Sequence, residues 1–421
     1  MTLDATLAAQ LAQAARSVAR VAAGKSLADE FATFPEASRG ALIDLTHGTL
    51  RRYGRVQAIV AALSHRGRPD ALIEALLWAS LYALDSGRYR DHTVVDEAVK
   101  ACGLLERWPA KGFVNALLRG YLRGRQAIEA RLALEPEARH QHPQWWIDAL
   151  RAAYPAQWEA VLCAGNGHPP MALRVNRRRA RAEDYLARLQ AEGVAARSLG
   201  NEAILLERPL PVERVPGFAA GDVSVQDAGA QRAAHCLDLA DGQRVLDACA
   251  APGGKSAHIL ELARVELTAV DADAERAARI APALQRLGLD AEVIVGDSAQ
   301  PDAWWDGRAY DRILADVPCS ASGIVRRHPD VKWLRRAGDL AAFAERQLAL
   351  LRALWRLLAP GGKLLYATCS VFPQENERVV DGFLAGERLG RRLETADGAA
   401  AQWLPDAEHD GFFYALIQKE A

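Results

Sequence analysis

The chain has 421 residues, of which 50% are apolar and 25% charged, a composition typical of globular proteins and unlike that of disordered chains. Its length predicts two or three domains. There is no run of about eighteen apolar residues, and apolar positions at the N-terminus recur at helical spacing instead of forming a signal-peptide core. We therefore expect a cytoplasmic protein without a membrane segment.

The charge distribution and the cysteine content limit which ligands the chain can be expected to bind. Residues 1–200 carry 27 Lys+Arg against 20 Asp+Glu, whereas residues 201–421 carry 25 against 33. The positive half can face a polyanion such as RNA, although a solvated basic helix surface explains the excess equally well. The six cysteines include no CxxC pair and no zinc-ligand spacing, so we expect reduced thiols and no metal site.

Residues 1–135 are predicted to form an all-helical bundle. Apolar residues recur three to four apart, and strand-like alternation is absent. The stretch "RWPAKGFVNALLRGYLRGR" predicts a helix with Phe113, Leu117 and Tyr121 on one face and basic residues elsewhere. The bundle should therefore have at least one basic face.

Residues 136–225 are predicted to form a small α+β module. The segment 171–193 reads as a short strand followed by a helix that ends at Gly193, and "AILLE" is a further strand candidate. Four arginines separate the first strand from the helix. They are candidates for phosphate contact, or else a solvated turn: Arg177, Arg178, Arg179 and Arg181.

Residues 226–421 show strand, loop and helix in repeated alternation. Five buried strands are predicted at "RVLDACA", "ELTAVDAD", "AEVIVGD", "DRILADVP" and "GGKLLYATCS", with helices at 254–263, 274–287 and 340–358. This rhythm predicts an α/β fold, a doubly wound, mostly parallel, Rossmann-like sheet. Such sheets bind ligands beyond the carboxyl ends of their strands.

The first strand–loop–helix junction, "VLDACAAPGGKS", is a candidate cofactor loop. Gly253 and Gly254 allow close backbone approach and begin a helix with a positive N-terminus. The loop lacks the first glycine of both the GxGxxG and the GxxxxGK[ST] motifs, and Pro252 removes an amide from any phosphate cradle. A ligand without phosphates is therefore favoured.

Aspartates follow the next two strands. Asp271, about twenty residues on, can accept hydrogen bonds from ribose hydroxyls, and Asp297 is placed to accept one from an adenine amino group. Capping of strand ends explains each aspartate alone. The ordered set instead predicts an adenosine without a pyrophosphate, which describes S-adenosylmethionine.

Two cysteines, Cys319 and Cys369, end the fourth and fifth strands. In a 3-2-1-4-5 order these strands are neighbours, so both thiols should face one pocket beside the sulfonium. Carbon 5 of a pyrimidine is a poor nucleophile until a thiolate adds to carbon 6, a step that needs a cysteine. The later loss of the C5 proton needs a second group, and the two thiols and Asp316 can divide this work. Methylation of an exocyclic amine needs no thiol.

The motifs "DACAAPGGKS", "DVPCSASG", "YATCSVFPQENE" and "DGFFYALIQK" together resemble the RNA cytosine-C5 methyltransferases of the Nop/Sun (Fmu) family. The resemblance covers 221–421, and the helical N-terminal third is similar to a NusB-like RNA-binding domain. In that family the TCS cysteine is the nucleophile and the PCS cysteine helps to release the product. DNA cytosine-C5 enzymes place the nucleophile in the PC motif and lack the TCS cysteine, so the pair indicates an RNA substrate.

The resemblance implies roles for individual residues. It makes Cys369 the nucleophile and Cys319 the eliminating partner, with Asp316 and Lys255 also in the catalytic set. The charge of Lys255 would favour a thiolate, although an exposed lysine at a helix start is the alternative. The implied S-adenosylmethionine-binding residues are Cys249, Ala250, Ala251, Pro252, Gly253, Gly254, Lys255, Asp271, Asp297 and Asp316.

Some positions depart from the family pattern or remain open. Ala321 stands where many relatives have glycine, and Gly229 where many have serine; neither is expected to touch a catalytic atom. Arg326, Arg327 and His328 are candidates for contact with RNA, or else a solvated loop. The helix at 340–358 is expected only to pack on the sheet.

The resemblance implies three domains: residues 1–135 NusB-like, 136–225 α+β, and 226–421 catalytic. The implied reaction is methylation of C5 of a cytidine in 16S rRNA, usually numbered 967, by a monomeric enzyme. Alternatives are a tRNA cytosine-C5 methyltransferase of the same family and, from another class, a catalytically idle RNA-binding or ribosome-assembly factor.

Overall fold

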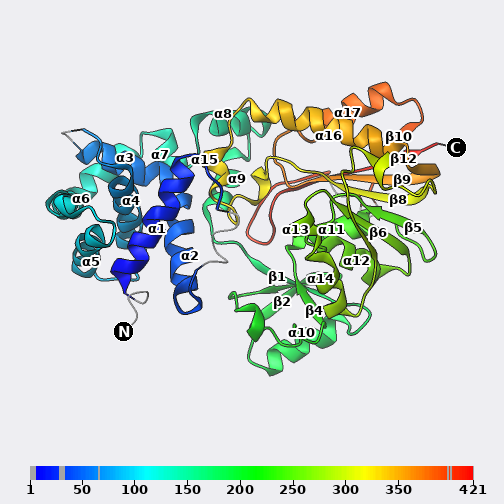
Figure 1. Cartoon of the computed structure of the whole chain (residues 1–421), viewed down its shortest axis with the longest axis horizontal. Helices are drawn as coiled ribbons and strands as arrows, with labels where there is room; N and C mark the ends of the chain where they lie inside the picture. Colours follow the sequence, from blue (N-terminus) through cyan, green and yellow to red (C-terminus); the bar gives the residue numbers. More distant parts are fainter. Residues whose placement is uncertain (1–5, 28–33, 65–66, 396–397, 399–400, 421) are drawn as a thin grey trace. The chain divides into compact units, whose positions relative to one another are not determined.

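The computed structural model describes residues 6–27, 34–64, 67–395, 398 and 401–420. The chain forms two compact units (Figure 1), one made of residues 1–168 with 325–337 and the other of residues 169–324 with 338–421. Among the described residues, no helix has the length and apolar character needed to cross a bilayer.

The first unit is helical, which confirms the expected bundle. α4 is buried on nearly all sides and packs against α1, as expected for a helix that is apolar all round. Thr6 precedes α1 as its N-cap, and its side chain accepts a hydrogen bond from the Ala9 amide. The helices are α1 (Leu7–Ala22), α2 (Glu36–Arg51), α3 (Tyr53–Leu63), α4 (Ala71–Asp85), α5 (Asp91–Leu104), α6 (Lys111–Leu132), α7 (Pro136–His140), α8 (Gln144–Ala153) and α9 (Trp158–Asn166), with a 3-10 turn, η3 (Trp108–Ala110), before α6.

The segment 325–337, which contains α15 (Val331–Leu334), belongs to this unit although it lies far along the chain. The buried Lys332 donates hydrogen bonds to the carbonyl oxygens of Arg51 and Gln141, at 3.2 and 2.9 Å, and to Oδ1 of Asn166 at 2.8 Å. Burial and the charge of Arg51 lower the pKa of Lys332 well below its usual value. The Arg326 side chain is also buried here, so the expectation that it contacts RNA is not supported.

The second unit begins with a small antiparallel sheet in the order β2-β3-β1-β4. The strand, helix and "AILLE" strand expected for this module are all present. The short strands β2 and β4 were not anticipated. The elements are β1 (Met171–Val175), α10 (Ala182–Ala191), β2 (Ala196–Gly200), β3 (Ala203–Leu206), η4 (Val212–Arg214) and β4 (Val223–Val225).

The large sheet has the order β10-β12-β9-β8-β5-β6-β7, with β11 paired to β12. Strands β7, β6, β5, β8 and β9 are parallel and confirm the predicted 3-2-1-4-5 order. β12 runs antiparallel beside β9 and was not predicted as a strand. The strands are β5 (Arg244–Asp247), β6 (Glu266–Asp271), β7 (Glu292–Val295), β8 (Tyr310–Asp316), β9 (Leu358–Thr368), β10 (Gly390–Leu393), β11 (Gln402–Trp403) and β12 (Phe412–Lys419).

Helices cover both faces of this sheet, as in a doubly wound fold. One apolar cluster joins α11 (Ala228–Cys236), α12 (Gly254–Leu262) and α14 (Ile280–Leu287) to one face. The other cluster joins α16 (Asp339–Trp355) and α17 (Glu377–Gly386) to the opposite face, so the packing role expected for α16 is confirmed. The single helix predicted at 274–287 is instead two, because α13 (Ala274–Ala277) ends before α14 begins.

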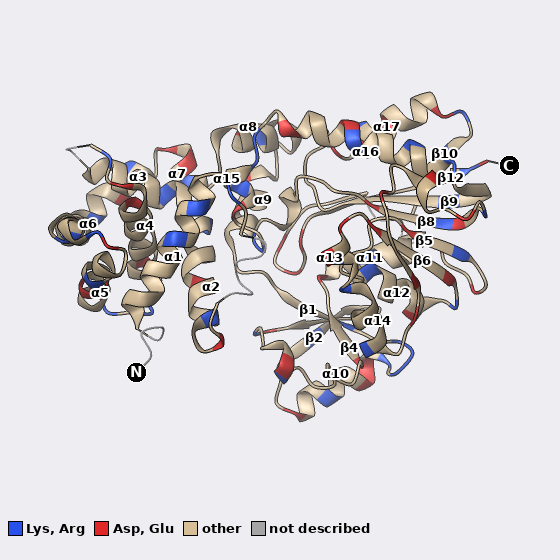
Figure 2. Cartoon of the chain, in the orientation of Figure 1, with Lys and Arg blue, Asp and Glu red and all other residues tan. Residues whose placement is uncertain are grey.

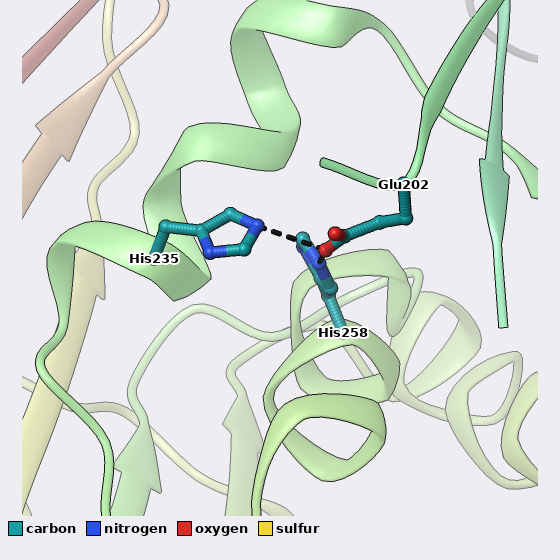
Figure 3. A group of neighbouring side chains, drawn as sticks. All are labelled: Glu202, His235 and His258. Carbon is teal, nitrogen blue, oxygen red and sulfur yellow. Dashed lines mark hydrogen bonds and ion pairs between the residues drawn. The ribbon is translucent and has the colours of Figure 1, made fainter. Parts of the chain in front are cut away.

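Buried polar contacts tie the small sheet to the helices of the large one. Arg174 of β1 forms a two-pronged ion pair with Glu261 of α12, with both N···O distances 2.8 Å, and donates to the Gly254 carbonyl at 2.8 Å. Nearby, His235 and His258 both direct Nε2 at Oε1 of Glu202 (Figure 3). These contacts fix the start of α12, and therefore the loop before it.

Candidate active site

The thiols of Cys319 and Cys369 meet at the carboxyl ends of the neighbouring strands β8 and β9. Their Sγ atoms lie 3.3 Å apart, within hydrogen-bonding distance and without a disulfide. Both residues are partly exposed. The amide of Gly323 donates to the Cys369 carbonyl at 2.8 Å, which links the two loops through the backbone as well. The expectation that the two sulfur atoms meet at the carboxyl ends of neighbouring strands is confirmed.

The contact between the two sulfur atoms affects the protonation of Cys319. The hydrogen bond with Cys369, followed by burial and by the charges of Cys369 and Glu375, raises the pKa of Cys319 well above its usual value, so this residue is a thiol at neutral pH. Either sulfur can be the donor in the hydrogen bond between them.

Asp316 and Lys255 lie beside the thiols. Nζ of Lys255 donates to Oδ2 of Asp316 at 2.5 Å, and both side chains are largely but not fully buried. Burial opposes the lysine charge, but Asp316, and further the sulfur of Cys369, raise the pKa of Lys255. Lys255 is thus a cation held near Cys369, and the alternative of an exposed lysine at a helix start does not fit this burial.

The loop from Cys249 to Gly254 joins β5 to α12. Gly253 has φ +98°, and a Cβ there would lie 3.3 Å from the Cα of Ile280, so this position needs glycine. Oδ2 of Asp271 accepts from the Ala251 amide at 3.0 Å, so this carboxylate also shapes the loop. Burial, with nearby carboxylates, raises the pKa of the Cys249 thiol, which is therefore protonated.

The strand-end acids fit an adenosine-type ligand to different degrees. Asp271 is buried and also accepts from the Asp273 amide at 3.0 Å, which leaves further lone pairs for a ribose hydroxyl. Asp297 is exposed and accepts from the Ala299 amide and the Gln300 side chain. Asp316 is the last residue of β8 and accepts a hydrogen bond from Lys255, at the start of α12. The three acids lie at the carboxyl ends of parallel strands, a placement that suits S-adenosylmethionine and offers no phosphate cradle.

Both departures from the family pattern have a structural context. Ala321, next to the Cys319–Ser320 pair, has φ +60°, a conformation that costs a non-glycine residue about 1 kcal/mol. This cost explains why glycine suits the position. A Cβ on Gly229 would lie 2.7 Å from Cδ2 of Phe412 and 3.1 Å from the Asp410 carbonyl, so a serine here would require that neighbourhood to shift.

Two buried acids near the site were not singled out in the sequence. Asp247 ends β5, and its Oδ2 accepts from the Ser256 hydroxyl at 2.6 Å; burial raises its pKa to about 7. Glu375 lies in the β9–α17 loop and contacts both cysteine loops. Asp247 is part of the quoted loop motif and Glu375 of "TCSVFPQEN", but nothing in the spacing alone distinguishes them from surface residues.

The sheet order, the glycine-containing loop after its first strand and the acids at the following strand ends define a class of protein, the S-adenosylmethionine-dependent methyltransferases. Models of three families match the chain. They are described as "16S rRNA methyltransferase RsmB/F" over residues 234–418, "Methyltr_RsmF/B-like, ferredoxin-like domain" over 142–213, and "NusB family" over 3–123.

Curated relatives match over nearly the whole chain. Ribosomal RNA small subunit methyltransferase B of Pseudomonas syringae pv. tomato is 43% identical and covers 97% of this chain and 96% of its own, and that of Sodalis glossinidius is 44% identical, covering 97% of each. The crystal structure of PH0851 has the same fold, with a TM-score of 0.79 at 22% identity, over 97% of this chain and 99% of its own. The chain belongs to the RsmB/F family of 16S rRNA methyltransferases.

Proposed function

We propose that this chain methylates C5 of a cytidine in 16S rRNA through a covalent adduct between Cys369 and carbon 6 of the base. By the resemblance noted in the sequence, the target is the cytidine usually numbered 967. The observation that carries the proposal is the 3.3 Å separation of two sulfur atoms at adjacent strand ends. The curated relatives, which are named as small-subunit RNA methyltransferases, support the choice of RNA.

Cys369 performs the first step. Its thiolate bonds to carbon 6, and the electron pair of the C5=C6 bond moves to carbon 5, which becomes nucleophilic. Bound S-adenosylmethionine supplies an electrophilic methyl group at this carbon. Lys255 favours the thiolate electrostatically, while Asp316 holds Lys255 in place.

Cys319 performs the last step. Cys319 is partly exposed, and its sulfur lies 3.3 Å from that of Cys369. Once Cys369 is bonded to carbon 6, the Cys319 thiol gives its own proton to water. The resulting thiolate accepts the C5 proton, the electron pair of that C–H bond restores the C5=C6 bond, and the C6–S bond breaks to release Cys369 as a thiolate.

Exposed basic residues of each unit are proposed to contact the RNA backbone. In the second unit these are the four arginines between β1 and α10, all exposed. In the first, Arg119 and Arg123 of α6 are exposed, among the mixed basic and acidic residues of its helices (Figure 2). We also propose a cytoplasmic monomer with a NusB-like domain at 1–135, an α+β domain at 136–225 and a catalytic domain at 226–421.

The roles of the two thiols are tested by alanine substitution. Cys369→Ala should abolish methyl transfer to 16S rRNA while S-adenosylmethionine binding stays within about twofold. Cys319→Ala should form the adduct but release it slowly, giving a retarded protein–RNA band on a denaturing gel. Cys163→Ala, which changes an exposed thiol on α9, is the matched control and should behave as wild type.

Two outcomes contradict the proposal. Undiminished turnover in Cys369→Ala would exclude the covalent mechanism, and the absence of a retarded band with Cys319→Ala would exclude the division of roles. Mapping of 5-methylcytidine in rRNA and tRNA from a deletion strain identifies the substrate. Loss of the modification from tRNA alone would contradict the rRNA assignment.

A further inference from the structure

Glu375 is a fully buried carboxylate between the two cysteine loops. Its Oε1 accepts a hydrogen bond from the Ser320 amide at 2.7 Å. Its Oε2 accepts from the hydroxyls of Ser320, at 2.5 Å, and Ser370, at 2.7 Å. Among the described residues no lysine or arginine forms an ion pair with this carboxylate, so hydrogen bonds alone replace its lost hydration.

The two serines are the residues that directly follow the two reactive cysteines. Ser320 follows Cys319 after β8, and Ser370 follows Cys369 after β9. A third hydroxyl, on Ser322, lies 3.0 Å from both serine hydroxyls. One carboxylate oxygen is therefore shared by two loops that lie some fifty residues apart in the sequence.

Neighbouring residues hold the carboxylate itself in place. Nε2 of Gln347, on α16, donates to Oε1 of Glu375 at 3.3 Å and to the Pro318 carbonyl at 3.0 Å. The hydroxyl of Tyr366 donates to the backbone carbonyl of Glu375 at 2.6 Å. The residues on both sides of Cys319 are thus tied to α16, through Gln347, and to the loop after β9, through Glu375.

We propose that Glu375 is a positioning residue that sets the separation of the Cys319 and Cys369 sulfur atoms by holding Ser320 and Ser370 on one carboxylate. Hydrogen bonds to an ionised acceptor are shorter and stronger than neutral ones, and a fully satisfied buried network fixes one geometry. Because the buried carboxylate accepts hydrogen bonds from both cysteine loops, it restricts where those two loops can lie. The role rests on the proposed function, because only a mechanism with two thiols needs their separation fixed.

Glu375→Gln in the full-length chain tests this role with little change in shape. Glutamine keeps one acceptor oxygen for the Ser320 amide but offers an NH₂ donor where the two hydroxyls donate. The first measurement is the rate at which dibromobimane, a reagent with two thiol-reactive arms, bridges Cys319 to Cys369, as identified by peptide mapping. We expect the variant to bridge at least fivefold more slowly than wild type. This measurement needs no RNA and no methyl transfer, so it separates a failure of the positioning role from a failure of the proposed function.

The second measurement is steady-state methyl transfer. We expect kcat to fall at least tenfold, with the KM for S-adenosylmethionine within twofold of wild type, because the cofactor loop does not contact Glu375. Thr268→Val is the matched control, since it removes a buried hydroxyl from β6 of the same sheet, and it should leave both rates within twofold. An unchanged bridging rate or an unchanged kcat in Glu375→Gln overturns the proposal.

If Glu375→Gln does not fold, the double variant Ser320→Ala with Ser370→Ala replaces it. This variant keeps the carboxylate and the Ser320 amide contact but removes both bridging hydroxyls. The proposal expects the same slower bridging and the same fall in kcat. It is overturned if this variant bridges and turns over like wild type.

Discussion

The buried pair of Arg174 and Glu261 gives the sharpest stability prediction. Both side chains are essentially inaccessible, at 0% and 1% exposed, and the guanidinium binds both carboxylate oxygens at 2.8 Å. In Arg174→Met the carboxylate of Glu261 remains buried without its partner, and the Gly254 carbonyl loses a donor. Breaking one side of a buried pair costs about 3–5 kcal/mol of unfolding free energy.

For a unit of this size, about 1 kcal/mol corresponds to roughly 2–4 °C in the midpoint of thermal unfolding. Arg174→Met should therefore lower the midpoint by roughly 6–20 °C. It should also weaken S-adenosylmethionine binding, because Gly254 begins the helix that follows the cofactor loop. Differential scanning calorimetry and isothermal titration measure the two effects. The double variant Arg174→Met with Glu261→Leu should recover most of the lost stability, because it removes the stranded charge.

Arg356→Met is the matched control for this prediction. Arg356 pairs with Asp302 at 3.0 Å, but the two side chains are 60% and 73% exposed, so the loss should stay below about 1 kcal/mol. Equal midpoints for Arg174→Met and Arg356→Met would refute the reasoning. So would a double variant no more stable than Arg174→Met alone, since the penalty would then not come from the unpaired carboxylate.

Two further predictions concern charge. Burial and the charge of Arg174 lower the pKa of His258 to about 3. Burial alone would raise the pKa of Glu202, but the hydrogen bonds from His235 and His258 lower it below its usual value. The unfolded chain therefore binds more protons than the folded one below about pH 6.5, and the stability of the second unit should fall as the pH drops from there. His258→Gln should flatten that fall in denaturant titrations, whereas the exposed His92→Gln should not; equal slopes would contradict the assignment. Lys255→Met should slow alkylation of Cys369 at neutral pH, because it removes the cation beside that sulfur, and an unchanged alkylation rate would show that Lys255 does not act on Cys369.

Local patterns were enough to predict the elements that position the site. The parallel strands β5 to β9 are apolar runs, each with a polar or reactive residue at or after its end, so the doubly wound sheet was predicted from the sequence. The 3-2-1-4-5 order came from the fold class, and with it the meeting of Cys319 and Cys369; the structure confirms both. The helical first unit followed from spacing alone. The break between α13 and α14 was missed because the apolar residues continue at helical spacing across it.

Contacts between distant segments could not be predicted in the same way. The β12 sequence is an apolar run like those of the other strands, and no local pattern in it indicates that it pairs antiparallel with β9. The buried Arg174 looked like one more basic residue beside an arginine cluster, and its partner Glu261 lies 87 positions away. The contacts of Glu375 likewise could not be predicted, because they form only when the fold brings the loops after β8 and β9 together.

The central claim is that Cys369 is the residue that bonds to the base. The direct measurement uses a 16S rRNA fragment with 5-fluorocytidine at the target position, incubated with the full-length protein and S-adenosylmethionine. Fluorine cannot leave carbon 5 as a proton does, so the methylated adduct should persist and mass spectrometry should locate it on the peptide that contains Cys369. An adduct on the Cys319 peptide, or a methylated RNA without any protein attached, would contradict the account.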